Sequence, residues 1–376
     1  MLQNKSSLED NFHFISNKSP QETTVVVAMS GGVDSSFVAA KLKTIGYNII
    51  GITLQLYDQG NIKTKSTCCA GQDIYDAKMV ADQFEFPHYV LDYESKFKQE
   101  VIEDFADSYL RGETPLPCAK CNQTVKFRDL LKFAKDLGAD TLATGHYVRN
   151  IAGSFGQELH KAIDRQKDQS YFLFNTTRKQ LEFTQFPLGG MTKESTRLEA
   201  MKLGLKIADK PDSQDICFVP NGSYSSVIAK IRPGSSKPGK FIHAEGYELG
   251  THDGIIHFTI GQRRGLGIAA KNPLYVIKID PLTNIVYLGE EKYLYTKNFL
   301  VSDVNWMGDS AIPEEGLDVE IKTRSRHLGA IARIYPLDKE RINVIIPGCD
   351  KSVSPGQACV FYDNTRVLGG GWISRE

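Results

Sequence analysis

The chain has 376 residues, of which 41% are hydrophobic and 24% are charged. This length exceeds one ordinary hydrophobic core, so we expect two or three domains. The 45 basic and 45 acidic side chains give a formal net charge of zero. Zero net charge excludes recruitment of nucleic acid by a global electrostatic field, and any such site must be a local patch. No apolar run approaches the ~20 residues of a membrane span, and seven cysteines do not suggest a secreted disulfide framework. We therefore expect a cytoplasmic protein.

The N-terminal half alternates between short apolar runs and helical stretches. Residues 23–30, TTVVVAMS, are rich in β-branched side chains, which is typical of a strand buried on both faces. A helical stretch follows and ends at Gly46. Further strands are predicted at 48–56, 87–92 and 140–146, with helical spacings of apolar residues between them. This alternation predicts an α/β domain, a Rossmann-like parallel sheet with helices on both faces.

The pattern changes near residue 212, where short strands and turns replace the alternation. A Gly, Pro and Ser cluster at 233–239 indicates a linker or surface loop. Short runs such as GIIHFTIG (254–261), DVEIKTRSR and QACVFYD predict strands of small barrels. We expect a disordered leader at 1–22, a catalytic α/β domain at 23–212, a central domain at 213–284 and a C-terminal β-barrel at 285–376.

The turn AMSGGVDSS (28–36) joins the first predicted strand to the first helix. Gly31 and Gly32 can adopt backbone angles closed to other residues and let a phosphate approach the main chain. The helix N-terminus that follows directs N–H groups and partial positive charge at an anion. Asp34 is unusual in a phosphate site unless it binds a metal, because a carboxylate alone repels the ligand. The alternative interpretation is a plain strand-to-helix turn capped by Ser or Asp.

Cys118 and Cys121 form a C-x-x-C spacing inside the Pro-rich stretch TPLPCAKCN. Zinc usually needs four ligands, commonly from two such pairs. The other cysteines are Cys68, Cys69, Cys217, Cys349 and Cys359. Because Cys68 and Cys69 are adjacent and would form a strained chelate, the pattern disfavours zinc.

The glycine-rich turn resembles the pyrophosphatase loop of the adenine nucleotide α-hydrolase-like enzymes, which activate a substrate oxygen with AMP. Seven further stretches, in order from about residue 23 to the end, resemble the bacterial tRNA-specific 2-thiouridylase family. They are GETPLPCAKCNQTVKF, LATGHYVR, KDQSYFLF, KPDSQDICFV, FTIGQRRGLGI, KTRSRH and SPGQACVFY. The resemblance implies an ATP-binding catalytic domain and a tRNA-binding barrel. It also implies that sulfur replaces the 2-oxygen of the wobble uridine in tRNAs for Lys, Glu and Gln. ATP and Mg²⁺ would be the cofactors, a cysteine desulfurase or sulfur-relay protein the partner, and a monomer the active form.

This reaction needs two separated cysteines, which we expect in mobile, polar loops. An adenylated oxygen leaves with AMP, sulfur arrives from a cysteine persulfide, and a second thiol breaks the sulfur–sulfur bond and leaves a disulfide. The resemblance assigns the persulfide to Cys217 and the nucleophile to Cys121. It places Leu116, Pro117 and Cys118 at the target base, where Cys118 replaces an Asp of the family as a candidate acid–base group. An alternative is an iron–sulfur cluster held by Cys118, Cys121 and Cys217.

Further site residues come from the same resemblance. It implies nucleotide contacts at Ala28, Met29, Ser30, Gly31, Gly32, Val33, Asp34, Ser35, Leu54 and Gly145, with Asp34 binding Mg²⁺. It implies tRNA contacts at His146, Lys167, Asp168, Gln169, Arg324, Ser325 and Gln357. Ser325 stands where the family usually has Tyr, while Arg324 lies in the densest cationic stretch of the tail. Two alternatives are another AMP-forming tRNA-modifying enzyme with this loop, which needs no cysteine pair, and a non-catalytic RNA-binding protein.

Overall fold

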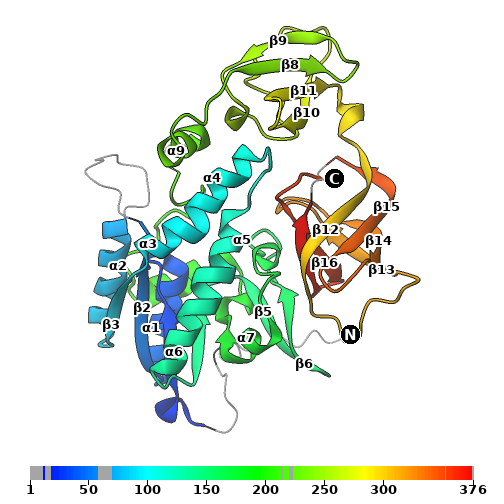
Figure 1. Cartoon of the computed structure of the whole chain (residues 1–376). Helices are drawn as coiled ribbons and strands as arrows, with labels where there is room; N and C mark the ends of the chain where they lie inside the picture. The colour runs from blue at the N-terminus through cyan, green and yellow to red at the C-terminus, as the bar shows by residue number, and fades with distance from the viewer. Residues whose placement is uncertain are drawn as a thin grey trace. The chain divides into compact units, whose positions relative to one another are not determined.

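The computed structural model describes residues 12, 18–57, 70–212, 215–219, 223–351 and 353–374. Two compact units are built from interleaved segments of the chain (Figure 1). The first unit comprises Met1–Lys98, Cys121–Phe218 and Thr365–Val367, and the second comprises Gln99–Lys120, Val219–Asn364 and Leu368–Glu376. Within the range predicted as a leader, Phe12 is fully buried and Pro20–Glu22 forms a 3-10 helix. Cys68 and Cys69 lie outside the described residues.

A five-stranded sheet forms the centre of the first unit, in the order β3-β2-β1-β4-β7. Its strands are β1 (Thr24–Ala28), β2 (Asn48–Gln55), β3 (His88–Asp92), β4 (Thr141–Thr144) and β7 (Thr184–Gln185). All four strand pairings are parallel. The predicted parallel sheet is therefore confirmed, and its four longer strands are the four that the apolar runs predicted.

The two faces of this sheet are covered by different helices, because alternate residues of β1 point to opposite sides. Val25 and Val27 pack in one apolar cluster with Phe37 of α1 (Val33–Ile45). Val26 lies in a second cluster with Leu130 and with residues of α6 (Leu131–Asp136). Burial of β-branched residues on both faces explains the continuous apolar run.

Other elements of the first unit complete the covering of the sheet. The helices are α2 (Ala70–Gln83), α3 (Glu94–Phe97), the π-helical stretch Asn122–Leu130, α7 (Arg178–Phe183) and α8 (Lys193–Lys202). Short 3-10 helices span Ser170–Phe172 and Pro187–Gly190. A hairpin of β5 (Val148–Gly153) and β6 (Gly156–Lys161) also belongs to this unit, and His160 of β6 pairs with Arg366. The helix α5 (Pro117–Cys121) begins in the second unit and ends in the first.

The second unit contains helices, a four-stranded sheet and a closed barrel. The π-helical stretch Lys98–Ile102 leads into α4 (Glu103–Leu110), and α9 spans Tyr224–Ile231. The sheet has the order β10-β11-β8-β9 and comprises β8 (Gly239–His243), β9 (Glu248–His252), β10 (Tyr275–Asp280) and β11 (Ile285–Gly289). A 3-10 helix at Glu291–Leu294 precedes the barrel.

The barrel has the strand order β12-β15-β14-β13-β16-β17 and closes by pairing of β12 with β17. Its strands are β12 (Thr296–Trp306), β13 (Leu317–Lys322), β14 (Ala330–Pro336), β15 (Ile342–Asp350), β16 (Ala358–Asp363) and β17 (Arg366–Ile373). Alternate side chains fill its interior, among them Val301, Ile321 and Phe361. The predicted order of an α/β domain, a small central domain and a C-terminal barrel is confirmed.

One predicted strand is wrong. Residues 254–261, GIIHFTIG, do not pair in a sheet, and Ile255–His257 forms a 3-10 helix instead. Ile255 and Ile256 are both buried, although they are neighbours. A strand with one solvent face would expose one of them, so the turn buries more apolar surface than the strand would. Among the described residues, no helix is long and apolar enough to cross a membrane.

Candidate active site

The glycine-rich turn lies between the carboxyl end of β1 and the start of α1. Gly31 has φ of 72°, and a Cβ there would lie 2.1 Å from the carbonyl oxygen of Asp73. Only glycine fits this conformation and this contact. Gly145, just after β4, is also closely packed, because a Cβ there would lie 2.7 Å from the backbone nitrogen of Ser35. The loop and the end of β4 therefore meet at one edge of the sheet, where ligands of open α/β sheets bind.

The first turn of α1 is suited to an anion. Its N-cap, Gly32, has no side chain to cap the helix, so the first N–H groups receive no capping hydrogen bond from it. Ser35 instead closes the loop internally, since its Oγ accepts a 3.0 Å hydrogen bond from the Ser30 nitrogen. Uncapped N–H groups and the helix dipole fit the phosphates of a nucleotide.

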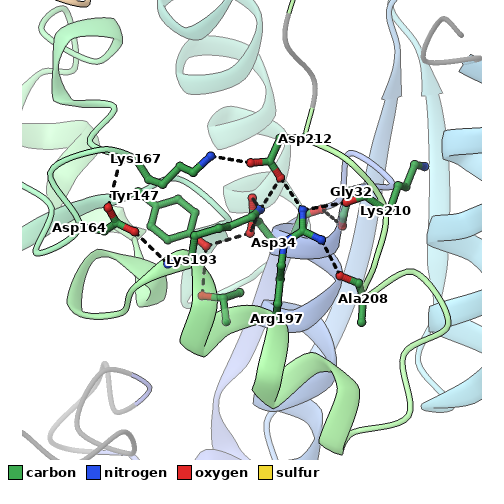
Figure 2. A network of polar contacts seen from close by, with 12 residues as sticks. Gly32, Asp34, Tyr147, Asp164, Lys167, Lys193, Arg197, Ala208, Lys210 and Asp212 are labelled. Atoms are coloured by element: carbon green, nitrogen blue, oxygen red, sulfur yellow. Dashed lines mark hydrogen bonds and ion pairs between the residues drawn. The ribbon is translucent and has the colours of Figure 1, made fainter.

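The carboxylate of Asp34 is held by a lysine that the sequence did not single out. Lys193 Nζ lies 2.7 Å from each carboxylate oxygen of Asp34, and the Tyr147 hydroxyl donates to Asp34 Oδ1 at 2.9 Å (Figure 2). Burial, reinforced by the Asp34 carboxylate, raises the pKa of Tyr147, so its hydroxyl remains a donor. Asp34 therefore does not face the loop as an isolated negative charge, and this pairing offsets the repulsion expected between its carboxylate and a phosphate.

Asp212 is the second carboxylate of this network. It accepts contacts from Lys167 Nζ at 2.7 Å, Lys193 Nζ at 2.9 Å and Arg197 Nη2 at 2.9 Å (Figure 2). Burial alone would raise the pKa of Asp212, but hydrogen bonds from Lys167 and Lys193 outweigh it and hold the pKa well below its usual value. Lys193 thus bridges two carboxylates that lie far apart in the sequence.

The predicted sulfur-transfer residues differ in exposure. Cys121 ends α5 and is 7% exposed, whereas Cys118 in the same helix is exposed. The expectation that Cys121 lies in a mobile, polar loop is therefore wrong. Pro117 fits the first position of a helix, and the helix that it starts carries Cys121 into a buried position. Cys217 is exposed and lies in a turn.

Cys217 is followed by a residue anchored in the first unit. Phe218 is buried, and its ring lies 5.7 Å from that of Phe97 at an interplanar angle of 74°. Phe97 is itself buried. Such an edge-to-face pair fixes the backbone next to the exposed thiol.

His146 follows β4 and is held by its neighbours. Its Nδ1 lies 2.8 Å from the Thr144 hydroxyl, and its ring lies near those of Phe127 and Phe186. Burial, with a smaller contribution from Lys126, lowers the pKa of His146 to about 3. The imidazole is therefore neutral at physiological pH and can act as a hydrogen-bonding group without charge.

The segment Lys167–Gln169, predicted to contact tRNA, makes contacts inside the first unit. Lys167 pairs with Asp212, as described above. Asp168 accepts hydrogen bonds from the Ala162 nitrogen and from the Ser170 hydroxyl. Gln169 Oε1 accepts a 2.9 Å bond from the nitrogen of Tyr147. These contacts fix the segment beside the Asp34 network.

The predicted tRNA contacts of the tail lie in the second unit. Arg324 Nη2 donates to the Ser354 hydroxyl at 2.9 Å, and Ser325 is exposed. The side-chain amide of Gln357 donates to the carbonyl oxygen of Thr114 at 2.9 Å. Gln357 thereby holds the stretch that leads to the partly buried Leu116 and then to Pro117 and Cys118. Leu54, near the end of β2, packs at the edge of the apolar cluster around Val26.

Several residues of the network escaped sequence reasoning. Lys210 and Asp212 stand in a stretch, KPDSQDICFV, from which only Cys217 received a role. Lys193 offered one signal, because it begins α8 and a cation at that end opposes the helix dipole. Tyr147 and Arg197 gave no comparable signal. Within the part of the chain that the structure describes, no group of three or more His, Cys, Asp or Glu side chains is placed to hold a metal ion.

Comparisons with known proteins match all three parts of the chain. Residues 23–221 match a family model described as a tRNA methyl transferase HUP domain. Residues 226–290 match a tRNA methyl transferase PRC-barrel domain, and residues 296–373 match an aminomethyltransferase beta-barrel domain.

Curated relatives match over nearly the whole length. A protein of Rickettsia felis named tRNA-specific 2-thiouridylase MnmA is 61% identical over 361 residues, which cover 96% of this chain and 99% of the relative. The protein of that name from Rickettsia bellii is 62% identical, with 96% and 98% coverage. A solved 4-thiouridine synthetase–RNA complex with bound ATP is 20% identical, covering 56% of this chain and 49% of its own, with a TM-score of 0.35. This structural similarity is too low to support a functional inference.

Proposed function

Because the chain belongs to the tRNA-specific 2-thiouridylase family, we propose that it catalyses the ATP-dependent replacement of the 2-oxygen of the wobble uridine in tRNA by sulfur. The observation that carries this proposal is identity of 61% over nearly the full length of a relative with this name. The glycine-rich loop supports it, because an uncapped helix N-terminus follows the loop and suits the phosphates of ATP. We propose tRNAs for Lys, Glu and Gln as substrates.

ATP supplies the AMP group that turns the 2-oxygen into a leaving group. We assign its phosphates to the loop from Ser30 to Ser35 and to the N-terminus of α1. The carboxylate of Asp34 is the hard oxygen ligand in the loop that suits Mg²⁺. Lys193 now occupies both of its oxygens, so binding of the metal there requires Lys193 to shift.

Cys217 and Cys121 divide the sulfur chemistry. A cysteine desulfurase or relay protein loads Cys217 as a persulfide, which its exposed position permits. The terminal sulfur bonds to carbon 2 of the activated uridine, and AMP leaves with the oxygen. Cys121 then attacks the Cys217 sulfur, breaks the sulfur–sulfur bond and leaves a Cys121–Cys217 disulfide that a thiol reductant reopens. Burial of Cys121 limits its competing reactions before this step.

The test is mass spectrometry of nucleosides from unmodified tRNA incubated with enzyme, ATP, Mg²⁺ and a persulfide donor. We expect 2-thiouridine at the wobble position, with AMP and pyrophosphate as the nucleotide products. Cys121→Ser and Cys217→Ser should yield none, because serine cannot carry a persulfide or form a disulfide. ADP and phosphate as products, or full activity of both variants, would refute the proposal.

The iron–sulfur alternative makes a different prediction for the same three cysteines. If Cys118, Cys121 and Cys217 held a cluster, protein purified without oxygen would be brown, and loss of any one thiol would remove iron, colour and activity together. Under persulfide chemistry the protein is colourless, and Cys118→Ala retains part of its activity. A visible spectrum recorded beside the thiolation assay separates the two mechanisms.

A further inference from the structure

The chain between α8 and Cys217 is fastened to the glycine-rich loop. Arg197 of α8 donates to the carbonyl oxygens of Ala208 and Lys210, both at 2.9 Å. Lys210 Nζ donates to the carbonyl oxygen of Gly31 at 3.0 Å and pairs with Asp73 at 2.7 Å. The backbone at 208–210 is therefore tied to α8 on one side and to the loop on the other.

Asp212 is the next of these attachments along the chain. Its carboxylate is 23% exposed and meets three cations, of which Lys193, at 10% exposed, is the most buried. Charge-assisted hydrogen bonds of this kind are about twice as strong as neutral ones. Five positions further along, Cys217 is exposed beside the buried Phe218. The described residues just before the thiol, 215 and 216, thus come between two fixed points of the chain, the Asp212 carboxylate and the Phe218 ring.

Lys193 links one of these fixed points, the Asp212 carboxylate, to the glycine-rich loop. Its ammonium is shared between Asp34 in the loop and Asp212 (Figure 2). Asp34 stands in the first turn of α1, so the Lys193 ammonium lies close to a helix N-terminus that attracts anions. A polyphosphate in the loop competes with Asp212 for Lys193, whereas Lys167 and Arg197 remain. Occupancy of the loop should therefore loosen Asp212 without releasing it.

We propose that Asp212 is a positioning residue for Cys217, and that Lys193 links it to the glycine-rich loop. When a nucleotide occupies the loop, Lys193 interacts less with Asp212, and Asp212 then holds the chain before Cys217 less firmly. The inference rests on the proposed function for its nucleotide part only. The positional part concerns the protein without ligands. By linkage, a nucleotide that weakens the contact between Lys193 and Asp212 is itself bound more tightly by a variant that lacks this contact.

The positional part is tested on the full chain without nucleotide. Asp212→Asn keeps the size of the side chain but removes its charge. The matched control is Asp129→Asn, because Asp129 also pairs with two cations of the same unit, Lys96 and Arg128. Iodoacetamide labelling of Cys217 is followed by peptide mass spectrometry, with the exposed Cys349 as internal reference. Labelling rates are compared at a pH at which they no longer rise, so that every Cys217 reacts as the thiolate. Amide hydrogen exchange at residues 215–219 gives a second measurement that does not depend on the charge of the thiol.

We expect Asp212→Asn to raise both rates about tenfold, a local change of about 1.4 kcal/mol, and Asp129→Asn to leave them within twofold. Unchanged rates in Asp212→Asn, or an equal rise in the control, would overturn the proposal. Should Asp212→Asn lose its cooperative unfolding transition, Lys167→Ala removes only one of the three cations and should raise the rates about threefold. Unchanged rates in Lys167→Ala would equally overturn the proposal that Asp212 positions Cys217.

The coupling part adds Mg-ATP without tRNA, with ATP binding measured separately by equilibrium dialysis. We expect wild-type Cys217 labelling to rise about threefold at saturation, and Asp212→Asn to bind ATP more tightly and show no further rise. A wild-type protein that binds ATP with no change in labelling would overturn the coupling. A wild-type protein that binds no ATP would refute the proposed function instead, and the ligand-free result would stand.

Discussion

Lowering the pH should destabilise the first unit through His146. The imidazole has an ordinary pKa of 6.5, and in the folded protein burial lowers it to about 3. Above pH 6.5 both the folded and the unfolded forms are neutral, so this histidine adds no pH dependence there. As the pH falls from 6.5 towards 3, the His146 imidazole becomes protonated in the unfolded state but stays neutral in the folded state. Stability is therefore lost with decreasing pH.

The size of the effect follows from the pKa difference. At pH 5 the solution lies about 1.5 pH units below the ordinary pKa, and about 1.4 kcal/mol per unit gives about 2 kcal/mol. His146 is partly exposed, so this value is an upper figure. His146→Asn removes the titration but keeps a polar group beside Thr144. Between pH 7 and pH 5 the wild type should lose up to about 2 kcal/mol more than the variant.

The measurement must report on the first unit alone. Both tryptophans, Trp306 and Trp372, lie in the second unit, so their fluorescence gives the control transition. Hydrogen exchange in β1 and β4 follows the first unit, and the wild type should lose up to about 30-fold more protection there than His146→Asn. Equal pH responses in the two proteins, or an NMR titration of this imidazole near its ordinary pKa, would refute the reasoning.

Three further predictions concern catalysis, tRNA binding and the local stability of the stretch before Cys118. Cys118→Asp should keep or raise thiolation in single-turnover assays, while Cys118→Ala should slow it by ~100-fold or more without ending it, and a dead Cys118→Ala enzyme would contradict this order. Arg324→Ala should raise the tRNA dissociation constant and lower the salt slope by about one phosphate contact, with ATP binding unchanged; equal tRNA affinity would place the phosphate contact elsewhere. Gln357→Ala removes the hydrogen bond to Thr114, so limited trypsin cleavage at Arg111 should become faster. Unchanged cleavage would show that the bond does not hold the stretch.

The sequence predicted the sheet well and the Asp34 network poorly, for a physical reason. Strands such as β1 are buried on both faces, and a run of β-branched residues records that burial directly. GIIHFTIG is also rich in β-branched residues, but its two buried isoleucines lie in a turn that only tertiary packing selects. The glycine-rich loop could be predicted because Gly31 meets a backbone constraint that no other residue satisfies. Lys193 could not, since its place at the start of a helix does not identify a partner, and Asp34 lies 159 positions away in the sequence.

The interleaving of the two units has a consequence for synthesis of the chain on the ribosome. Thr365–Val367 belong to the first unit, where the Thr365 carbonyl oxygen accepts a hydrogen bond from the Lys161 nitrogen and Arg366 pairs with Glu158. These partners emerge roughly 200 residues after β6, which at ~5–20 residues per second means a delay of roughly 10–40 seconds.

During that delay one edge of β6 lacks its contacts with Thr365 and Arg366. The charge of Glu158 on this strand opposes association with other nascent chains. Folding of the second unit is delayed in the same way, because Gln99–Lys120 precede the rest of this unit by nearly a hundred residues. A gene divided after Phe218 would therefore encode two fragments that each lack a segment made by the other.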